Sequence, residues 1–139
     1  SFTGISPMGC LPLERVTNLD DPFSCARSYN DLAVDFNGRL RRLVTKLNRE
    51  LTGIKIYFAN PYDIMWDIVT KPNLYGLEIS SSACCGTGLF EMGFLCGQDN
   101  PLTCSDANKF VFWDAFHPTE RTNQIVSDHF FKHLKNLFH

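Results

Sequence analysis

The residues best suited to chemistry are Asp114 and His117, which stand three positions apart. We expect them in the turn that enters a helix, where this spacing can place both side chains on one side of the chain. A carboxylate there can accept a hydrogen bond from one imidazole nitrogen and so fix the tautomer of the ring. The other nitrogen is then free to take a proton from a hydroxyl nucleophile. The pair is therefore a candidate general base with its orienting acid.

Other interpretations of these residues remain open at this point. An Asp-x-x-His spacing is common, and a capping or core role explains it as well. The segment around Ser6 superficially resembles a nucleophile elbow, but its second glycine comes one residue late and Pro7 removes a backbone donor. Cys84 or Cys85 could serve His117 as a thiol nucleophile, although disulfide bonding explains both cysteines better.

Cysteines form the second informative pattern. The six are Cys10, Cys25, Cys84, Cys85, Cys96 and Cys104. An even number among turn residues favours disulfide bonds and an oxidising compartment. The alternative is a metal site, but the sequence has no C-x-x-C pair to chelate zinc. We expect Cys10 to pair with Cys25, because they bracket a loop rich in Pro, Asp and Asn, and the other pairings stay open.

Three helices are predicted to position these residues. The first begins near Ser28 and ends at Gly53, and the second covers residues 62–69. The third covers residues 119–137. Apolar residues at three- and four-residue steps form one stripe on the first helix, namely Leu32, Phe36, Leu40, Leu43, Leu47 and Leu51. On the third helix the residues expected to face inward are Ile125, Val126, Phe130, Leu134 and Leu137.

Short β-rich segments alternate with these helices. Strands are predicted at residues 1–5, 54–59 and 109–113, whereas residues 10–28 and 72–100 are expected to be irregular. A strand directly after a long helix indicates an αβ unit with a parallel sheet. With no internal repeat or linker, residues 1–139 are expected to form a single domain of the α/β class.

Bulk properties exclude several functions. A formal net charge of −2 and the lack of a long basic run give no support for nucleic-acid binding. No apolar stretch is long enough to span a bilayer. The chain opens without Met or a signal peptide, which suits a processed or truncated chain. His129 and His133 have a spacing that can hold a metal ion, but a solvated helix flank explains them better.

Three motifs, in order, resemble one known family. Residues 114–120 read Asp-Ala-Phe-His-Pro-Thr-Glu and resemble the last block of plant-type GDSL esterases/lipases of the SGNH hydrolase superfamily. Residues 7–12 (Pro-Met-Gly-Cys-Leu-Pro) are similar to another block of plant members. Cys84-Cys85-Gly86-Thr87-Gly88, followed by Cys96 and Cys104, resembles their cysteine-rich stretch.

The resemblance implies a fold and an activity. The fold would be part of a three-layer α/β/α (flavodoxin-like, SGNH hydrolase) sandwich with a short parallel sheet. The activity would be hydrolysis of small-molecule or lipid esters through an acyl-enzyme, with His117 as base and Asp114 as its orienter. No metal or organic cofactor is implied, and the expected location is extracellular.

Some blocks of that family do not occur in this sequence. The Gly-Asp-Ser block that carries the nucleophile is absent, as are the blocks whose Gly and Asn help to form the oxyanion hole. The chain therefore corresponds to the C-terminal two-fifths of a member, and we expect it to be inactive alone. An inactive secreted binding or interaction module is the alternative. A sheet cut part-way would leave an open edge for a partner to cover.

Overall fold

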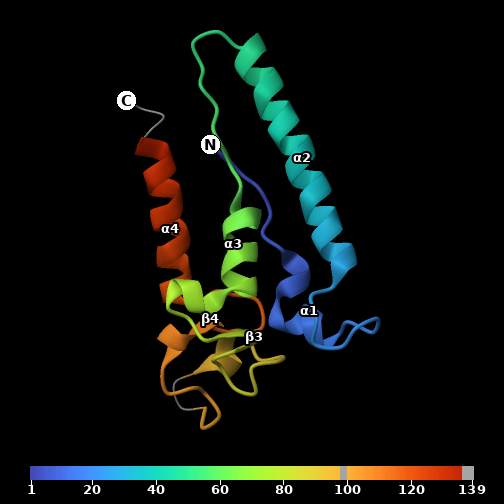
Figure 1. Ribbon diagram of the computed structural model, residues 1–139, viewed down its shortest axis with the longest axis vertical. Helices are drawn as coiled ribbons and strands as arrows, with labels where there is room; N and C mark the ends of the chain where they lie inside the picture. Colours follow the sequence, from blue (N-terminus) through green and yellow to red (C-terminus); the bar gives the residue numbers. More distant parts are fainter. Residues whose placement is uncertain (98–99, 136–139) are drawn as a thin grey trace.

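Three helices dominate the computed structural model, which describes residues 1–97 and 100–135. They are α2 (Arg27–Glu50), α3 (Pro61–Thr70) and α4 (Glu120–Lys135). Figure 1 shows α3 between α2 and α4, with all three helices extending from the end of the molecule that holds the short helix α1 (Pro12–Val16) and the later strands. None of the helices in the described residues is long and apolar enough to cross a membrane.

The strands are short and pair in parallel. β1 (Phe2–Thr3) pairs with β2 (Phe58–Ala59), and β3 (Ile79–Ala83) pairs with β4 (Phe110–Phe112). The register places Phe2 beside Phe58 and Ile79 beside Phe110. The predicted α/β class with parallel strands is confirmed. The described strands form two separate two-stranded sheets, however, instead of one continuous sheet.

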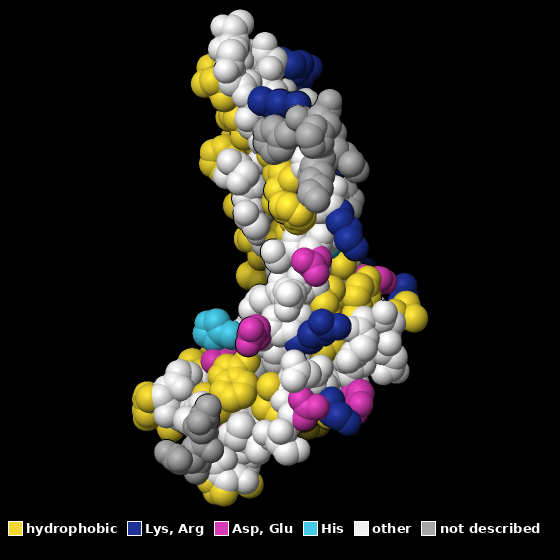
Figure 2. Space-filling model, turned by 90° about the vertical axis from the view of Figure 1, so that its left-hand side faces the viewer, with side chains coloured by type: hydrophobic (Ala, Val, Ile, Leu, Met, Phe, Trp, Pro, Cys, Tyr) yellow, Lys and Arg dark blue, Asp and Glu magenta, His cyan; other side chains and the backbone are white. Residues whose placement is uncertain are grey.

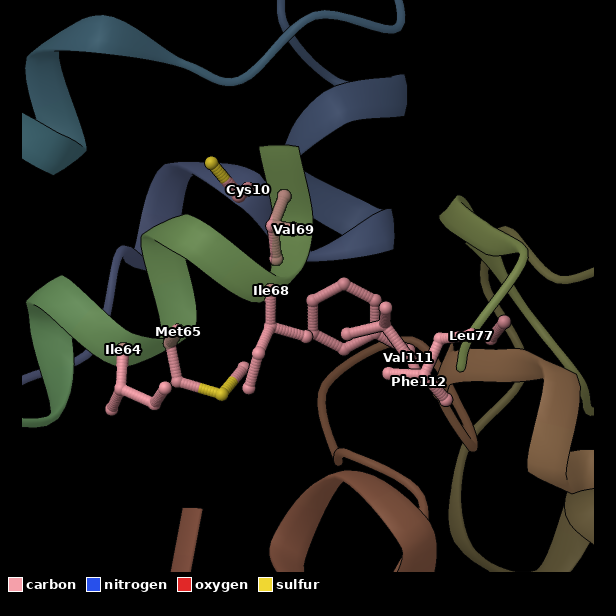
Figure 3. Packing of buried hydrophobic residues seen from close by; sticks show 9 residues of the cluster. Cys10, Ile64, Met65, Ile68, Val69, Leu77, Val111 and Phe112 are labelled. Carbon is pink, nitrogen blue, oxygen red and sulfur yellow. The ribbon is translucent and has the colours of Figure 1, made fainter. Parts of the chain in front are cut away.

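The core is centred on α3 and the β3–β4 pair. Figure 3 shows Ile68 and Val69 of α3 beside Val111 and Phe112 of β4. Ile68 and Val111 are fully buried, and Phe112 is 1% exposed. The predicted inward residues of α4, Ile125, Val126 and Phe130, pack against this core. Leu134 is half-buried and Leu137 lies outside the described residues.

Helix α2 leaves most of its apolar stripe exposed, and the stripe residues Leu40 and Leu47 are half-buried. Leu32 is 62% exposed and Leu43 is 50% exposed, and Phe36 and Leu51 are also exposed. The residues that α2 buries lie on a neighbouring face, and they are Asn30, Ala33, Asn37 and Val44. The face that α2 turns inward is therefore not centred on its apolar stripe.

Two asparagines explain which face of α2 turns inward. The Asn37 side chain accepts from the backbone N–H of Ile5 at 2.7 Å and donates to its carbonyl at 2.8 Å. The Asn30 side chain accepts from the N–H of Gly9 at 2.9 Å. These bonds fix α2 against the segment that follows β1, and they offset the cost of burying the two amide side chains.

Several predicted boundaries need correction. The strand predicted at residues 54–59 is confined to β2, because the Asn48 side chain binds both the N–H and the carbonyl of Ile56 at 2.7 Å. A side chain that satisfies backbone groups competes with strand pairing. Residues 10–28 contain α1, and residues 72–100 contain β3 and two 3₁₀ turns, Pro72–Tyr75 and Gly93–Cys96. Helix α2 begins at Arg27, one residue before the predicted start near Ser28, and Ser28 does not cap it.

Candidate active site

The loop between β4 and α4 carries both candidate residues, Asp114 and His117. It turns back on itself, because the N–H of Trp113 donates to the carbonyl of His117 at 2.8 Å. Pro118 then forms an isolated antiparallel bridge with Phe112. The turn brings the two side chains to the same side of the loop, as the three-residue spacing predicts.

Asp114 and His117 form a direct contact. Nδ1 of His117 lies 2.9 Å from each carboxylate oxygen of Asp114. A carboxylate offers only acceptors, so this contact requires the proton on Nδ1. Nε2 of the neutral ring then carries the free lone pair. This is the arrangement that a general base needs, with the second nitrogen held by an acid.

The electrostatics of Asp114 favour its charged form. Burial by itself would raise the pKa of this carboxyl, whose side chain is only 4% exposed. The backbone N–H groups of Phe116 and His117 donate to Oδ1 at 2.9 and 2.7 Å, and the His117 ring adds a third bond. Together they lower the pKa below its ordinary value. Asp114 is therefore a fixed, ionised acceptor.

The ring of His117 is open to solvent. Its side chain is 72% exposed, in contrast to that of Asp114. Within the described residues, Asp114 is the hydrogen-bond partner of the ring. Nε2 is therefore accessible to a group brought by a substrate or by another segment of protein.

Neighbouring elements hold the loop through its backbone. Cys85, just after β3, donates its N–H to the carbonyl of Trp113 at 2.8 Å. Ala115 donates to the carbonyl of Glu91 at 3.0 Å and accepts from the N–H of Leu13 in α1 at 3.4 Å. Three segments that are distant in sequence thus converge on the residues around Asp114.

The far end of the loop is fixed by two buried threonines. Thr119 and Thr122 are both nearly inaccessible to solvent. The hydroxyl of Thr119 donates to the carbonyl of Phe110 at 2.9 Å, and that of Thr122 donates to the carbonyl of Val111 at 2.9 Å. These bonds tie the start of α4 to β4, so the loop is anchored on both sides.

Disulfide bonds complete the support. Cys84 pairs with Cys104 and Cys85 with Cys96, while Cys10 pairs with Cys25 as predicted. No described cysteine is free, so neither a thiol nucleophile nor cysteine ligation of a metal is possible in this state. His129 and His133 form no part of a metal-binding group among the described residues, and the side chain of His133 lies outside them.

Hollows on the surface offer space beside the loop. One of about 530 Å³ is lined by residues of the loop and of α4, including Trp113, Pro118 and Asn123. Another of about 390 Å³ lies between α2 and α3, away from Asp114. Hydrophobic side chains also reach the surface at the end of the molecule that holds β3 and β4 (Figure 2). Phe90, Met92, Phe94 and Leu95 are all exposed there.

Comparison with known proteins decides the family. The sequence pattern of the GDSL-like lipase/acylhydrolase family matches residues 1–130. The chain belongs to this family. It is 53% identical over 138 residues to the GDSL esterase/lipase At4g26790 of Arabidopsis thaliana, covering 99% of this chain and 39% of that protein. It is 48% identical over 128 residues to the GDSL esterase/lipase At2g04570 of the same plant, covering 92% of this chain and 37% of the relative.

The GDSL chain described here therefore spans less than two-fifths of the length of these curated relatives. A further relative, the GDSL esterase/lipase EXL3 of Arabidopsis thaliana, is 39% identical over 123 residues, which cover 88% of this chain and 34% of that protein.

Sequence reasoning missed some of the residues that hold the candidate site. Glu91 lay within a segment expected to be an irregular loop, and nothing in its local pattern indicates contact with Ala115. The polar Thr122 does give a signal of a buried contact, because it falls among the inward positions of an amphipathic helix. A threonine there needs a buried partner.

Proposed function

We propose that this chain supplies the base and the acid of a serine ester hydrolase. His117 would accept the proton of a serine hydroxyl through Nε2 as that oxygen attacks an ester carbonyl. Asp114 would hold the ring and stabilise its charged form. The alcohol would leave with the proton from His117, and water would then hydrolyse the acyl-enzyme by the same base.

The observation that carries the proposal is the contact of Nδ1 with both oxygens of the buried Asp114 at 2.9 Å. It fixes the tautomer, and the ring still presents its other nitrogen to solvent. A capping role alone would not require this exposed ring on a buried, ionised carboxylate. Family membership supports the same reaction, since the relatives are named esterases/lipases.

The nucleophile and the oxyanion donors would come from outside these 139 residues, because the sequence contains no Gly-Asp-Ser block. We propose that residues 1–139 are the C-terminal portion of a GDSL hydrolase domain and do not turn over esters alone. The substrate class is a small-molecule or lipid ester, and no metal or organic cofactor takes part. Three disulfide bonds favour a secreted, extracellular protein.

The first experiment compares the chain alone with a complete hydrolase built from it. In that chimera, the N-terminal portion of the relative At4g26790 precedes this chain. Hydrolysis of a short-chain p-nitrophenyl ester and labelling by a fluorophosphonate probe are measured on both proteins. We expect neither activity nor labelling of the chain alone, and both in the chimera. His117→Ala and Asp114→Ala in the chimera should each lower kcat by roughly 10⁴-fold.

The matched control is His129→Gln in the chimera, which removes an imidazole of α4 outside the loop and should leave kcat unchanged. Turnover by the chain alone, with one labelled serine, would show that a nucleophile lies within these residues. An active chimera that is insensitive to His117→Ala would refute the assigned base.

A specific observation favours a second candidate function, that of a binding module. The exposed apolar stripe of α2 and the open edge of β1 are surfaces that a partner could cover. Size-exclusion chromatography with light scattering tests this proposal on the chain alone. A concentration-dependent dimer would support self-association through these surfaces, and a strict monomer would contradict it.

A further inference from the structure

We propose that Glu91 is a positioning residue for the Asp114–His117 pair. The inference rests on the proposed ester-hydrolase function, because it concerns the orientation of the same base. It extends that function by naming a third side chain that acts through the loop and does not touch the substrate.

The Glu91 carboxylate closes the loop on which it lies. It accepts from the hydroxyl of Thr87 at 2.8 Å and from the N–H of Phe90 at 3.4 Å. The side chain lies flat on Gly86, where an added Cβ would meet Cγ and Cδ of Glu91 at 2.6 Å. Gly86 also has a φ of +59°, which disfavours other residues. The turn at Gly86 and the Glu91 side chain therefore fit each other closely.

This closed loop presents the backbone of Glu91 to the active-site loop. The carbonyl of Glu91 accepts from the N–H of Ala115 at 3.0 Å. Ala115 is 1% exposed and lies between Asp114 and His117 in the turn. The direction of this carbonyl thus helps to set the direction of the peptide that follows Asp114.

The disulfide between Cys85 and Cys96 makes the closed loop a rigid support. Cys85 stands directly before Gly86 and is bonded to Cys96, so the bridge spans the whole segment that contains Glu91. Cys85 also donates its N–H to Trp113, which precedes Asp114. The segment therefore contacts the active-site loop at two points, and the Glu91 side chain fixes the shape of the chain between them.

The charge of Glu91 supports this structural role. Partial burial raises the pKa of its carboxyl, but hydrogen bonds from Thr87 and from nearby backbone N–H groups outweigh this effect and lower the pKa to about 2. The side chain is therefore an anion throughout the neutral range, and the bonds that it accepts are charge-assisted. Such bonds hold geometry better than neutral ones.

The test measures the tautomer of the His117 ring in the isolated chain by ¹⁵N NMR of the ring nitrogens at alkaline pH. In the native chain we expect the Nδ1-protonated form to dominate. Glu91→Ala should lower the ratio of Nδ1-protonated to Nε2-protonated ring several-fold, because the turn no longer holds Asp114 in register with Nδ1. Glu91→Gln should restore most of the native ratio, since an amide oxygen still accepts from Thr87.

Two further variants keep the test decisive. Thr87→Val removes one donor to Glu91 and should lower the ratio by less, and it decides the matter if Glu91→Ala does not fold. Glu78→Gln is the control, since it neutralises an exposed glutamate paired with Lys109 at 3.1 Å, away from the loop. Native nitrogen signals in folded Glu91→Ala and Thr87→Val would overturn the proposal, as would an equal change in Glu78→Gln. Because no ester is involved, the result is independent of whether the complete enzyme is active.

Discussion

The end of the molecule that holds β3 and β4 and the long helix α2 are held in different ways. At the end that holds β3 and β4, two disulfides and a set of backbone hydrogen bonds converge on the Asp114–His117 loop. Along α2, by contrast, four residues of the apolar stripe, Leu32, Phe36, Leu43 and Leu51, are exposed, and two asparagines make the inward hydrogen bonds. The backbone of the Asp114–His117 loop is thus held from several sides, whereas most of the hydrophobic face of α2 is exposed in the described residues. The difference indicates that the geometry of the Asp114–His117 pair can be set locally even when the hydrophobic face of a neighbouring helix is left exposed.

The largest expected effect on the free energy of unfolding comes from removing a disulfide bond near the Asp114–His117 loop. Replacing both Cys84 and Cys104 by Ala removes a bridge with a sequence separation of 20 residues. In the chain-entropy model this costs about 3 kcal/mol of unfolding free energy. Urea denaturation of the variant and of the native chain, followed by circular dichroism, measures the difference. A loss near zero would mean that the hydrogen bonds alone hold this part of the molecule.

A smaller effect should separate two neighbouring positions of α2. Val44 is 5% exposed and Leu43 is 50% exposed. Val44→Ala should lower the free energy of unfolding by about 1–2 kcal/mol, because it removes buried methyl groups. Leu43→Gln should change it by less than about 0.5 kcal/mol, as surface substitutions do.

The same urea titration measures both α2 variants, each compared with the native chain. If Leu43→Gln proves as costly as Val44→Ala, the stripe is covered in solution, and the contrast between α2 and the end that holds β3 and β4 disappears.

The smallest expected effect is the loss of folding stability at low pH that Glu91 and Asp114 cause. The pKa of Glu91 is lowered from 4.5 to about 2, and that of Asp114 is also lowered. A carboxyl whose pKa is lower in the folded than in the unfolded chain stabilises the protein at pH values above its unfolded pKa. This contribution is lost as the pH falls through the pKa of the folded chain. Stability should therefore decline between about pH 4.5 and about pH 2.

Thermal melts across that pH range, with Glu91→Gln for comparison, measure this response. The variant should show a flatter decline than the native chain because it lacks one titrating group. An equally steep decline in the variant would assign the acid sensitivity to other carboxyls.

Local sequence patterns were sufficient where the governing interactions are themselves local. The Asp114–His117 spacing predicted a contact within one turn, and the structure has it at 2.9 Å. The Cys10–Cys25 pairing and the span of α3 also follow from neighbouring residues. Family membership followed from three short motifs, in the right order, because each motif can be read as a run of adjacent residues.

Tertiary structure alone decided the rest. The orientation of α2 depends on Asn30 and Asn37, which form hydrogen bonds to backbone groups 21 and 32 residues away. The apolar periodicity of a helix contains no information about such distant partners. The strand β3 forms because β4 lies beside it, although its run of serines has little strand propensity of its own. The support that Glu91 gives to Ala115 belongs to the same class, since it depends on two loops that meet only in the folded chain.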